Sequence, residues 1–131
     1  MKKIIVVLLI SCLLVTGCGS TQEKAEVEAI TTSEVKEIID NYDENSDVVI
    51  VDVRTRDEYH NKHLAGAINI PLDDIDTFPD TVDKNMKVIV YCQSGNRSSQ
   101  AAEKLVEMGY LYVYDMGGIN SWTYEFVEDV Q

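Results

Sequence analysis

The sequence has few basic side chains and no apolar run long enough to cross a membrane. Lysine and arginine together number 11, against 23 aspartates and glutamates, and the formal net charge is -12. Nucleic acid attracts basic surfaces, so an acidic chain is a poor partner for it. The longest apolar run covers 12 residues from Ile4 to Val15, whereas a membrane-spanning helix needs roughly 18 or more. We therefore expect neither nucleic-acid binding nor a permanent transmembrane helix.

Cysteine and histidine are scarce as well, with three and two copies respectively. His60 and His63 lie close to an expected turn, and neither is accompanied by a recognisable set of further ligands. A metal site needs several such ligands together, so we expect both histidines to be structural. The sequence thus predicts no metal site and no cofactor.

The N-terminus has the features of a secretory signal. Lys2 and Lys3 precede the apolar run, and Val15 to Cys18 resembles the lipobox of bacterial lipoproteins, with Val15 where that family more often has leucine. The resemblance implies cleavage before Cys18 and diacylglycerol on its sulfur. The domain would then be held at the extracytoplasmic face of a bacterial membrane by its lipid alone. The alternative is an ordinary cleaved signal in which Cys18 has no role.

These features divide the chain into three parts: a signal peptide over residues 1–17, the lipidated cysteine and a flexible acidic linker over 18–28, and one folded domain over 29–131. Cleavage removes Cys12 and lipid blocks Cys18, so Cys92 is left as a free thiol and no internal disulfide can form. An unpaired cysteine is a liability in an oxidising compartment unless the thiol has a function. The cysteine count therefore favours catalysis at Cys92.

Along the domain, apolar periodicity predicts alternating strands and helices. Strands are predicted at residues 48–53, 67–70, 88–91 and 111–114. A capping box of Thr31 and Glu34 begins one helix, and a second should begin at Thr55 or Asp57. Further helices are predicted from Ser98 to a stop near residue 109 and over residues 119–126. This alternation indicates an open α/β sheet, in which ligands bind at the carboxyl ends of the strands.

Cys92 follows the apolar strand predicted at residues 88–91 and precedes the helix predicted from Ser98. The residues between them must form a tight loop at a helix N-terminus, where backbone N–H groups, the helix dipole and Arg97 favour a thiolate. A lone cysteine at a strand end is otherwise usually a small buried apolar residue. The loop and Arg97 change that interpretation, and the segment predicts covalent sulfur chemistry.

Three stretches resemble, in order and spacing, the signatures of single-domain rhodaneses. The first and third resemble the N-terminal and C-terminal signatures of that family, and the second resembles its active loop. They read Val51-Asp52-Val53-Arg54 with Glu58-Tyr59 and His63-Leu64-Ala65-Gly66-Ala67-Ile68-Asn69-Ile70-Pro71, then Cys92-Gln93-Ser94-Gly95-Asn96-Arg97-Ser98, and last Gly117-Gly118-Ile119-Asn120-Ser121-Trp122. Lys62 departs from the family, which usually has glycine before the histidine.

The resemblance implies an α/β fold with an open, mainly parallel five-stranded sheet and helices on both faces. It also implies sulfane sulfur transfer, in which Cys92 takes sulfur from a donor such as thiosulfate, holds it as a persulfide and passes it to a thiol or another thiophilic acceptor. We expect a monomer with small-molecule partners. The implied active loop comprises Gln93, Ser94, Gly95, Asn96, Arg97 and Ser98.

Charged, glycine and aromatic residues have expected roles around this loop. The planar guanidinium of Arg97 suits the oxygens of an anionic donor, although it would also suit backbone carbonyls of the loop. Asp52 is expected to order the neighbouring loops, by accepting N–H bonds or by pairing with Arg54 or Arg56, rather than to take protons. Gly117, Gly118 and Trp122 are expected to form a turn and a packing contact near the site.

Two other functions remain open from the sequence. A Cdc25-like phosphatase or arsenate reductase has five residues between its cysteine and arginine, whereas four separate Cys92 from Arg97 here. The shorter loop suits one added sulfur atom better than a tetrahedral oxyanion. A non-catalytic binding module built on the same scaffold is the second alternative, and the retained Cys92 argues against it.

Overall fold

The structure is a computed structural model that describes residues 25–129. The expected signal peptide, with Cys12, and the expected lipidation site Cys18 lie outside these residues, as does most of the expected linker. Within the described part of the chain, no helix has the length and apolarity needed to cross a membrane.

One open sheet forms the centre of the domain. Its strands are β1 Val27–Ala29, β2 Val48–Asp52, β3 Ile68–Asn69, β4 Lys87–Cys92 and β5 Tyr112–Gly118. They lie in the order β1-β5-β4-β2-β3, and every neighbouring pair is parallel. The carboxyl ends of the strands therefore meet at one edge, where Cys92 pairs with Gly118. This arrangement confirms the predicted open α/β fold with a five-stranded sheet.

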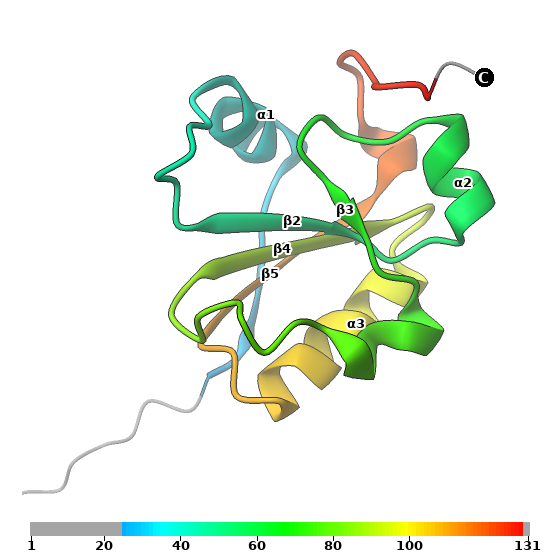
Figure 1. The fold of residues 1–131 in the computed structure, drawn as a ribbon. Coiled ribbons are helices and arrows are strands. Elements are labelled where there is room, and N and C mark those ends of the chain that lie inside the picture. The colour runs from blue at the N-terminus through cyan, green and yellow to red at the C-terminus, as the bar shows by residue number, and fades with distance from the viewer. Residues whose placement is uncertain (1–24, 130–131) are drawn as a thin grey trace, which may run out of the picture.

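Helices cover both faces of this sheet. They are α1 Thr32–Asp40, α2 Arg56–Asn61 and α3 Asn96–Glu107, with 3-10 turns η1 Leu72–Thr77 and η2 Ile119–Ser121. Figure 1 shows α1 on one side of the sheet and α3 on the other. Capping boxes begin the first two helices, Thr31 with Glu34 and Thr55 with Glu58. Short sequence signals thus fix where both helices start.

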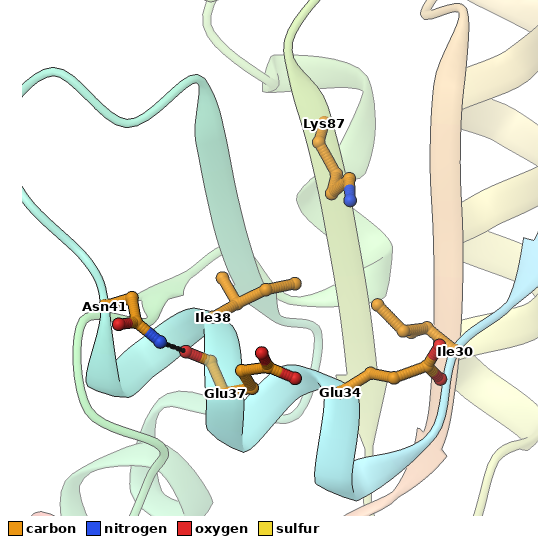
Figure 2. A pocket seen from close by; sticks show the side chains of 6 residues that line it. All are labelled: Ile30, Glu34, Glu37, Ile38, Asn41 and Lys87. Carbon is orange, nitrogen blue, oxygen red and sulfur yellow. Dashed lines mark hydrogen bonds between the residues drawn. The ribbon is translucent and has the colours of Figure 1, made fainter.

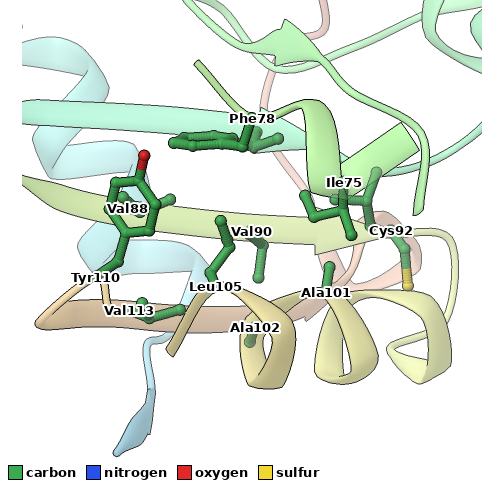
Figure 3. Packing of buried hydrophobic residues seen from close by; sticks show 12 residues of the cluster. Ile75, Phe78, Val88, Val90, Cys92, Ala101, Ala102, Leu105, Tyr110 and Val113 are labelled. Atoms are coloured by element: carbon green, nitrogen blue, oxygen red, sulfur yellow. The ribbon is translucent and has the colours of Figure 1, made fainter. Parts of the chain in front are cut away.

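Side chains alternate along the strands, so the sheet has a separate apolar core on each face. Val90 and Cys92 of β4 share a buried cluster with Ala101 of α3 (Figure 3). Tyr91 belongs to the cluster on the opposite face, together with Val35 of α1. The direction of the Cys92 side chain, toward the start of α3, follows from this alternation.

The sheet extends beyond the strands read from the sequence. Val27 and Glu28 were predicted to belong to the linker, but they lie in β1, which pairs in parallel with residues 113–115 of β5. The prediction was wrong at these two positions. All three β1 side chains are exposed, so the strand lacks the apolar residues by which strands were predicted. Backbone hydrogen bonds hold such an edge strand, and they leave no apolar pattern in the sequence.

Residues 119–126 do not form the predicted helix. Ile119–Ser121 makes one 3-10 turn, and the chain then runs irregularly to Val127, which forms an antiparallel bridge with His63. Ile119 and Trp122 are both buried on the face of the sheet that α1 covers. The apolar spacing therefore comes from two residues that bury the ends of one short turn, and the helix prediction was wrong.

An open groove of about 550 Å³ lies between α1 and the start of β4. Figure 2 shows its lining, with Lys87 on β4 and the α1 side chains facing it; the lining residues are Ile30, Glu34, Glu37, Ile38, Asn41 and Lys87. Lys87 is the first residue of β4, whereas Cys92 is the last. This groove therefore lies at the opposite end of the strand from the free thiol.

Candidate active site

The loop that carries Cys92 is short and tightly folded. Cys92 is the last residue of β4, Gly95 is the N-cap of α3, and α3 already begins at Asn96, two residues before the predicted start at Ser98. Gly95 has a φ of 109°, a left-handed conformation that favours glycine. The Cys92 side chain is 1% exposed, so the sulfur lies inside the loop. Only Gln93 and Ser94 remain between the strand and the helix cap.

Two groups of this loop contact the sulfur directly. The backbone N–H of Gly95 donates a hydrogen bond to Cys92 Sγ at 3.0 Å, and Ser98 Oγ lies 3.5 Å from the same sulfur. Ser98 Oγ also lies 3.1 Å from the Gly95 carbonyl oxygen. A hydroxyl has one proton to donate. It can therefore donate to the carbonyl while Cys92 is a thiol, and must turn toward the sulfur when Cys92 becomes a thiolate.

The thiol is activated by these hydrogen bonds. Burial of Cys92 works against ionisation, but the Ser98 hydroxyl, followed by backbone N–H groups of the loop, stabilises the thiolate and lowers the pKa of Cys92 overall. Fixed donors at a helix N-terminus stabilise the negative form of whatever they surround. The same donors would hold an added sulfur atom with its charge.

Arg97 forms an ion pair with a carboxylate of the same chain. Its Nη1 donates to Glu58 Oε2 at 2.8 Å and its Nη2 donates to Glu58 Oε1 at 2.9 Å. The Thr55 backbone N–H and hydroxyl both donate to Glu58 Oε2 at 2.9 Å. The bonds from Arg97, followed by those from Thr55, lower the pKa of Glu58 to about 2. The guanidinium is thus paired with a carboxylate, which neither of the roles expected from the sequence included.

Glu58 was missed as a site residue. The sequence shows it in a capping box with Thr55, which fully accounts for an acidic residue at that position. Its second role depends on Arg97, which lies 39 residues further along the chain. No local pattern connects the two side chains, so only the resemblance to a family signature drew attention to Glu58.

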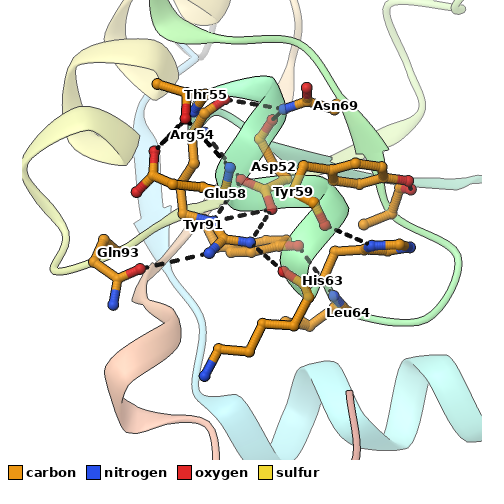
Figure 4. A network of polar contacts seen from close by, with 12 residues as sticks. Asp52, Arg54, Thr55, Glu58, Tyr59, His63, Leu64, Asn69, Tyr91 and Gln93 are labelled. Atoms are coloured by element: carbon orange, nitrogen blue, oxygen red, sulfur yellow. Dashed lines mark hydrogen bonds and ion pairs between the residues drawn. The ribbon is translucent and has the colours of Figure 1, made fainter. Parts of the chain in front are cut away.

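Asp52 and Arg54 form a second ion pair at the same edge of the sheet. Both are buried, with 0% and 2% exposure, and Arg54 Nη2 donates to Asp52 Oδ2 at 2.6 Å. The backbone N–H of Arg54 also donates to Asp52, and Arg54 Nη2 donates to the Lys62 carbonyl. Figure 4 shows the Arg54 guanidinium between Asp52 and Gln93. The structure therefore places Asp52 as an acceptor that orders the neighbouring loop.

The end of β5 fixes the other side of the active loop. A bulge shifts the register so that Tyr91 pairs with Gly117. A Cβ atom on Gly118 would lie 2.6 Å from the Gln93 carbonyl oxygen, closer than real Cβ contacts allow. Asn120 accepts a hydrogen bond from the Gln93 amide at 2.6 Å and donates its backbone N–H to the Gln93 carbonyl. The expected turn at residues 117–118 is thus a bulged strand end packed on the loop.

Trp122 and the histidines lie away from the sulfur or have structural contacts. Trp122 is buried in the core beneath α1, and its Nε1 donates to the Glu125 carbonyl. His63 stacks on Tyr59, with ring centroids 3.9 Å apart. Within residues 25–129 no three histidine, cysteine or acidic side chains are grouped so that they would hold a metal ion.

Known proteins resemble both the sequence and the fold. The sequence model of the rhodanese-like domain family matches residues 31–125 of this chain. Thiosulfate sulfurtransferase PspE of Escherichia coli is 46% identical over 71 residues, covering 53% of this chain and 68% of PspE. Thiosulfate sulfurtransferase GlpE of Coxiella burnetii is 38% identical over 77 residues, covering 58% and 72%. A solved rhodanese with anions from E. coli superposes with a TM-score of 0.58 at 41% identity, covering 62% of this chain and 98% of that one.

Proposed function

Because the chain belongs to the rhodanese-like domain family and is a sulfurtransferase of the rhodanese type, we propose that it transfers sulfane sulfur through a persulfide on Cys92. The observation that supports this mechanism is the position of the sulfur: Cys92 Sγ lies at the start of α3, 3.0 Å from the Gly95 N–H. A nucleophile in that position is stabilised as an anion, both before and after it takes up sulfur.

The proposed reaction has two steps. With thiosulfate as donor, the Cys92 thiolate attacks the outer sulfur, the S–S bond of thiosulfate breaks, and sulfite leaves with the electron pair of that bond. The product is a Cys92 persulfide anion. In the second step a thiolate or cyanide attacks the outer sulfur of the persulfide, takes it, and releases the Cys92 thiolate. Each step exchanges one bond to sulfur for another, so no external oxidant or reductant is needed.

The size of the loop favours sulfur over a larger group. Four residues separate Cys92 from Arg97, and α3 begins at the last of them. The backbone donors are therefore already within hydrogen-bond distance of the sulfur itself. The outer sulfur of a persulfide lies one bond from Sγ, whereas the oxygens of a phosphate or arsenate on Cys92 would lie two bonds from it and would need donors further out.

Sulfur transfer from thiosulfate to cyanide by the purified full-length chain tests this proposal. We expect thiocyanate formation that is abolished in Cys92→Ser, and negligible hydrolysis of an aryl phosphate or reduction of arsenate. Ser99→Ala, on an exposed neighbour of the loop, serves as the control and should retain the wild-type rate. Phosphate hydrolysis that depends on Cys92, with no thiocyanate formed, would contradict the proposal.

We also propose that Cys18 is lipidated and that the protein works as a monomer at the extracytoplasmic face of a bacterial membrane, with a small sulfur donor and a thiol acceptor. The support is the charged start, the short apolar run and the lipobox-like residues before Cys18. Metabolic labelling with a fatty acid tests the anchor. We expect a Cys18→Ser variant to lose the label. Unchanged labelling of that variant would contradict the proposal, because the lipid would then be attached to another residue.

A further inference from the structure

The arginine of the active loop and the arginine that contacts the loop are both neutralised by carboxylates. Arg97, within the loop, is paired with Glu58, and Arg54, which contacts Gln93, is paired with Asp52. The hydrogen bonds at the Cys92 sulfur come from a backbone N–H and a serine hydroxyl, which carry no net charge. The described part of the site therefore presents hydrogen-bond donors to a substrate, but little net positive charge.

This charge balance matters differently for two classes of sulfur donor. Thiosulfate brings two negative charges toward the Cys92 thiolate and releases sulfite, which is also a dianion. A protonated organic persulfide, R–S–SH, brings none: the thiolate attacks its outer sulfur, the S–S bond of the donor breaks, and R–S⁻ leaves with the electron pair while Cys92 becomes a persulfide, Sγ–SH. The sum of charges in the site is three negative in the first case and one in the second. Unlike charges attract and like charges repel most strongly where water is excluded.

We propose that Glu58 determines donor specificity by neutralising Arg97, so that the site prefers organic persulfides and other donors without a sulfonate group over thiosulfate. This proposal rests on the persulfide mechanism proposed above. Glu58 is a selectivity residue that acts through Arg97, not a residue that contacts the transferred sulfur.

Several features keep Glu58 in this role. It accepts two bonds from Arg97 and two from Thr55, so its carboxylate is held by four donors on two helices. A carboxylate with so many donors stays ionised at physiological pH. Both side chains are about one-third exposed, at 31% and 32%. The pair is therefore open to solvent, and Arg97 lies in the first turn of α3, directly after the Gly95 cap next to Cys92.

Arg97 keeps further N–H groups beyond the two that Glu58 occupies, because a guanidinium carries five donors. A donor molecule can thus still reach Arg97. What Glu58 removes is the net attraction for a dianion. Loss of Glu58 and loss of Arg97 should therefore change the use of thiosulfate in opposite directions, whereas a purely structural ion pair would be impaired by the loss of either partner.

Steady-state kinetics of the full-length chain with thiosulfate and with an alkyl persulfide test the proposal. In Glu58→Gln the KM for thiosulfate should fall about tenfold, as expected when a charge-assisted contact becomes available, while kcat/KM for the alkyl persulfide changes less than twofold. Gln can still accept the bonds from Thr55, since a capping box accepts either residue. Arg97→Gln should raise the KM for thiosulfate, and in that background Glu58→Gln should no longer lower it.

Asp57→Asn is the matched control, because it removes the same charge from the neighbouring exposed position of α2. It should leave both KM values unchanged. Equal changes for the two donors in Glu58→Gln, or a fall in thiosulfate KM of the same size in Asp57→Asn, would overturn the proposal.

The wild-type chain gives a second test that does not depend on a variant folding. Its kcat/KM should be larger for the alkyl persulfide than for thiosulfate, and the reverse order would overturn the assignment of Glu58 alone. If neither donor loads sulfur onto Cys92, the persulfide mechanism is overturned as well. Wild type and Cys92→Ser would then be equally inactive with both donors.

Discussion

The two arginine–carboxylate pairs beside the active loop have the same chemistry but different surroundings. Asp52 and Arg54 are almost wholly buried, whereas Glu58 and Arg97 are about one-third exposed. A buried pair cannot lose one partner without leaving an uncompensated charge in the protein interior. A partly exposed pair exchanges its contacts with water at little cost. Loss of one partner of the buried pair should therefore destabilise the scaffold, whereas the exposed pair is free to influence which substrate binds.

The largest effect should come from breaking the buried pair. Arg54→Met leaves the Asp52 carboxylate buried without its main partner, so we expect a loss of about 3 to 5 kcal/mol in the free energy of unfolding. Denaturant unfolding measures it. Arg56→Ala, at an exposed position of α2, should stay within about 0.5 kcal/mol of wild type. A loss in Arg54→Met as small as that in Arg56→Ala would contradict the expected cost of breaking the buried pair.

A second substitution asks whether backbone packing, rather than either ion pair, sets the shape of the loop. In Gly118→Ala the new Cβ would press on the Gln93 carbonyl, and a displacement of the loop should lower kcat/KM for sulfur transfer about a hundredfold. Gly66→Ala is the control for backbone strain without a close contact, because Gly66 has a positive φ, unlike Gly118, and nothing lies within 4 Å of its added Cβ. Equal activity of the two variants would contradict the role of Gly118.

Activation of the thiol should depend on Ser98 rather than on either arginine pair. Ser98→Ala removes the hydroxyl next to Cys92 Sγ, so the pKa of the thiol should rise. The rate of alkylation at pH 7 should fall about fivefold, as expected for one hydrogen bond of about 1 kcal/mol. The pH dependence of alkylation gives the pKa directly. An unchanged profile would assign the activation to the backbone N–H groups alone.

The smallest effect should be the stability change in Glu58→Gln. Because the pKa of Glu58 is lowered from 4.5 to about 2 in the folded protein, its ionised form stabilises the fold above pH 4.5 and loses this contribution as the pH falls toward 2. At neutral pH the variant should be less stable by no more than about 1 kcal/mol, given the exposure of the pair. Unfolding curves at several pH values should converge with those of wild type in acid.

Much of this fold could be predicted from the sequence, because local signals determine it. The apolar runs gave β2 and β4, the capping boxes gave the starts of α1 and α2, and the position of Cys92 between a strand and a helix gave the active loop. The pairing of Asp52 with Arg54 was one of the arrangements expected, since the two residues are neighbours in the sequence.

Features that depend on distant parts of the chain could not be predicted. β1 is held by backbone bonds to β5, and residues 119–126 pack through one 3-10 turn instead of a helix. The Glu58–Arg97 pair joins two helices, and Gly118 meets the loop only once the sheet has formed. In each case the decisive neighbour is far away in the sequence, where neither periodicity nor a short motif gives its position.

Cys92 is proposed to accept a single sulfur atom, and intact-mass spectrometry of the full-length chain tests this transfer most directly. After incubation with an alkyl persulfide or with thiosulfate, the protein should gain the mass of one sulfur atom, and cyanide should remove it. Cys92→Ser should gain nothing under the same conditions. A wild-type mass that stays unchanged with both donors, or the same gain in Cys92→Ser, would contradict the account.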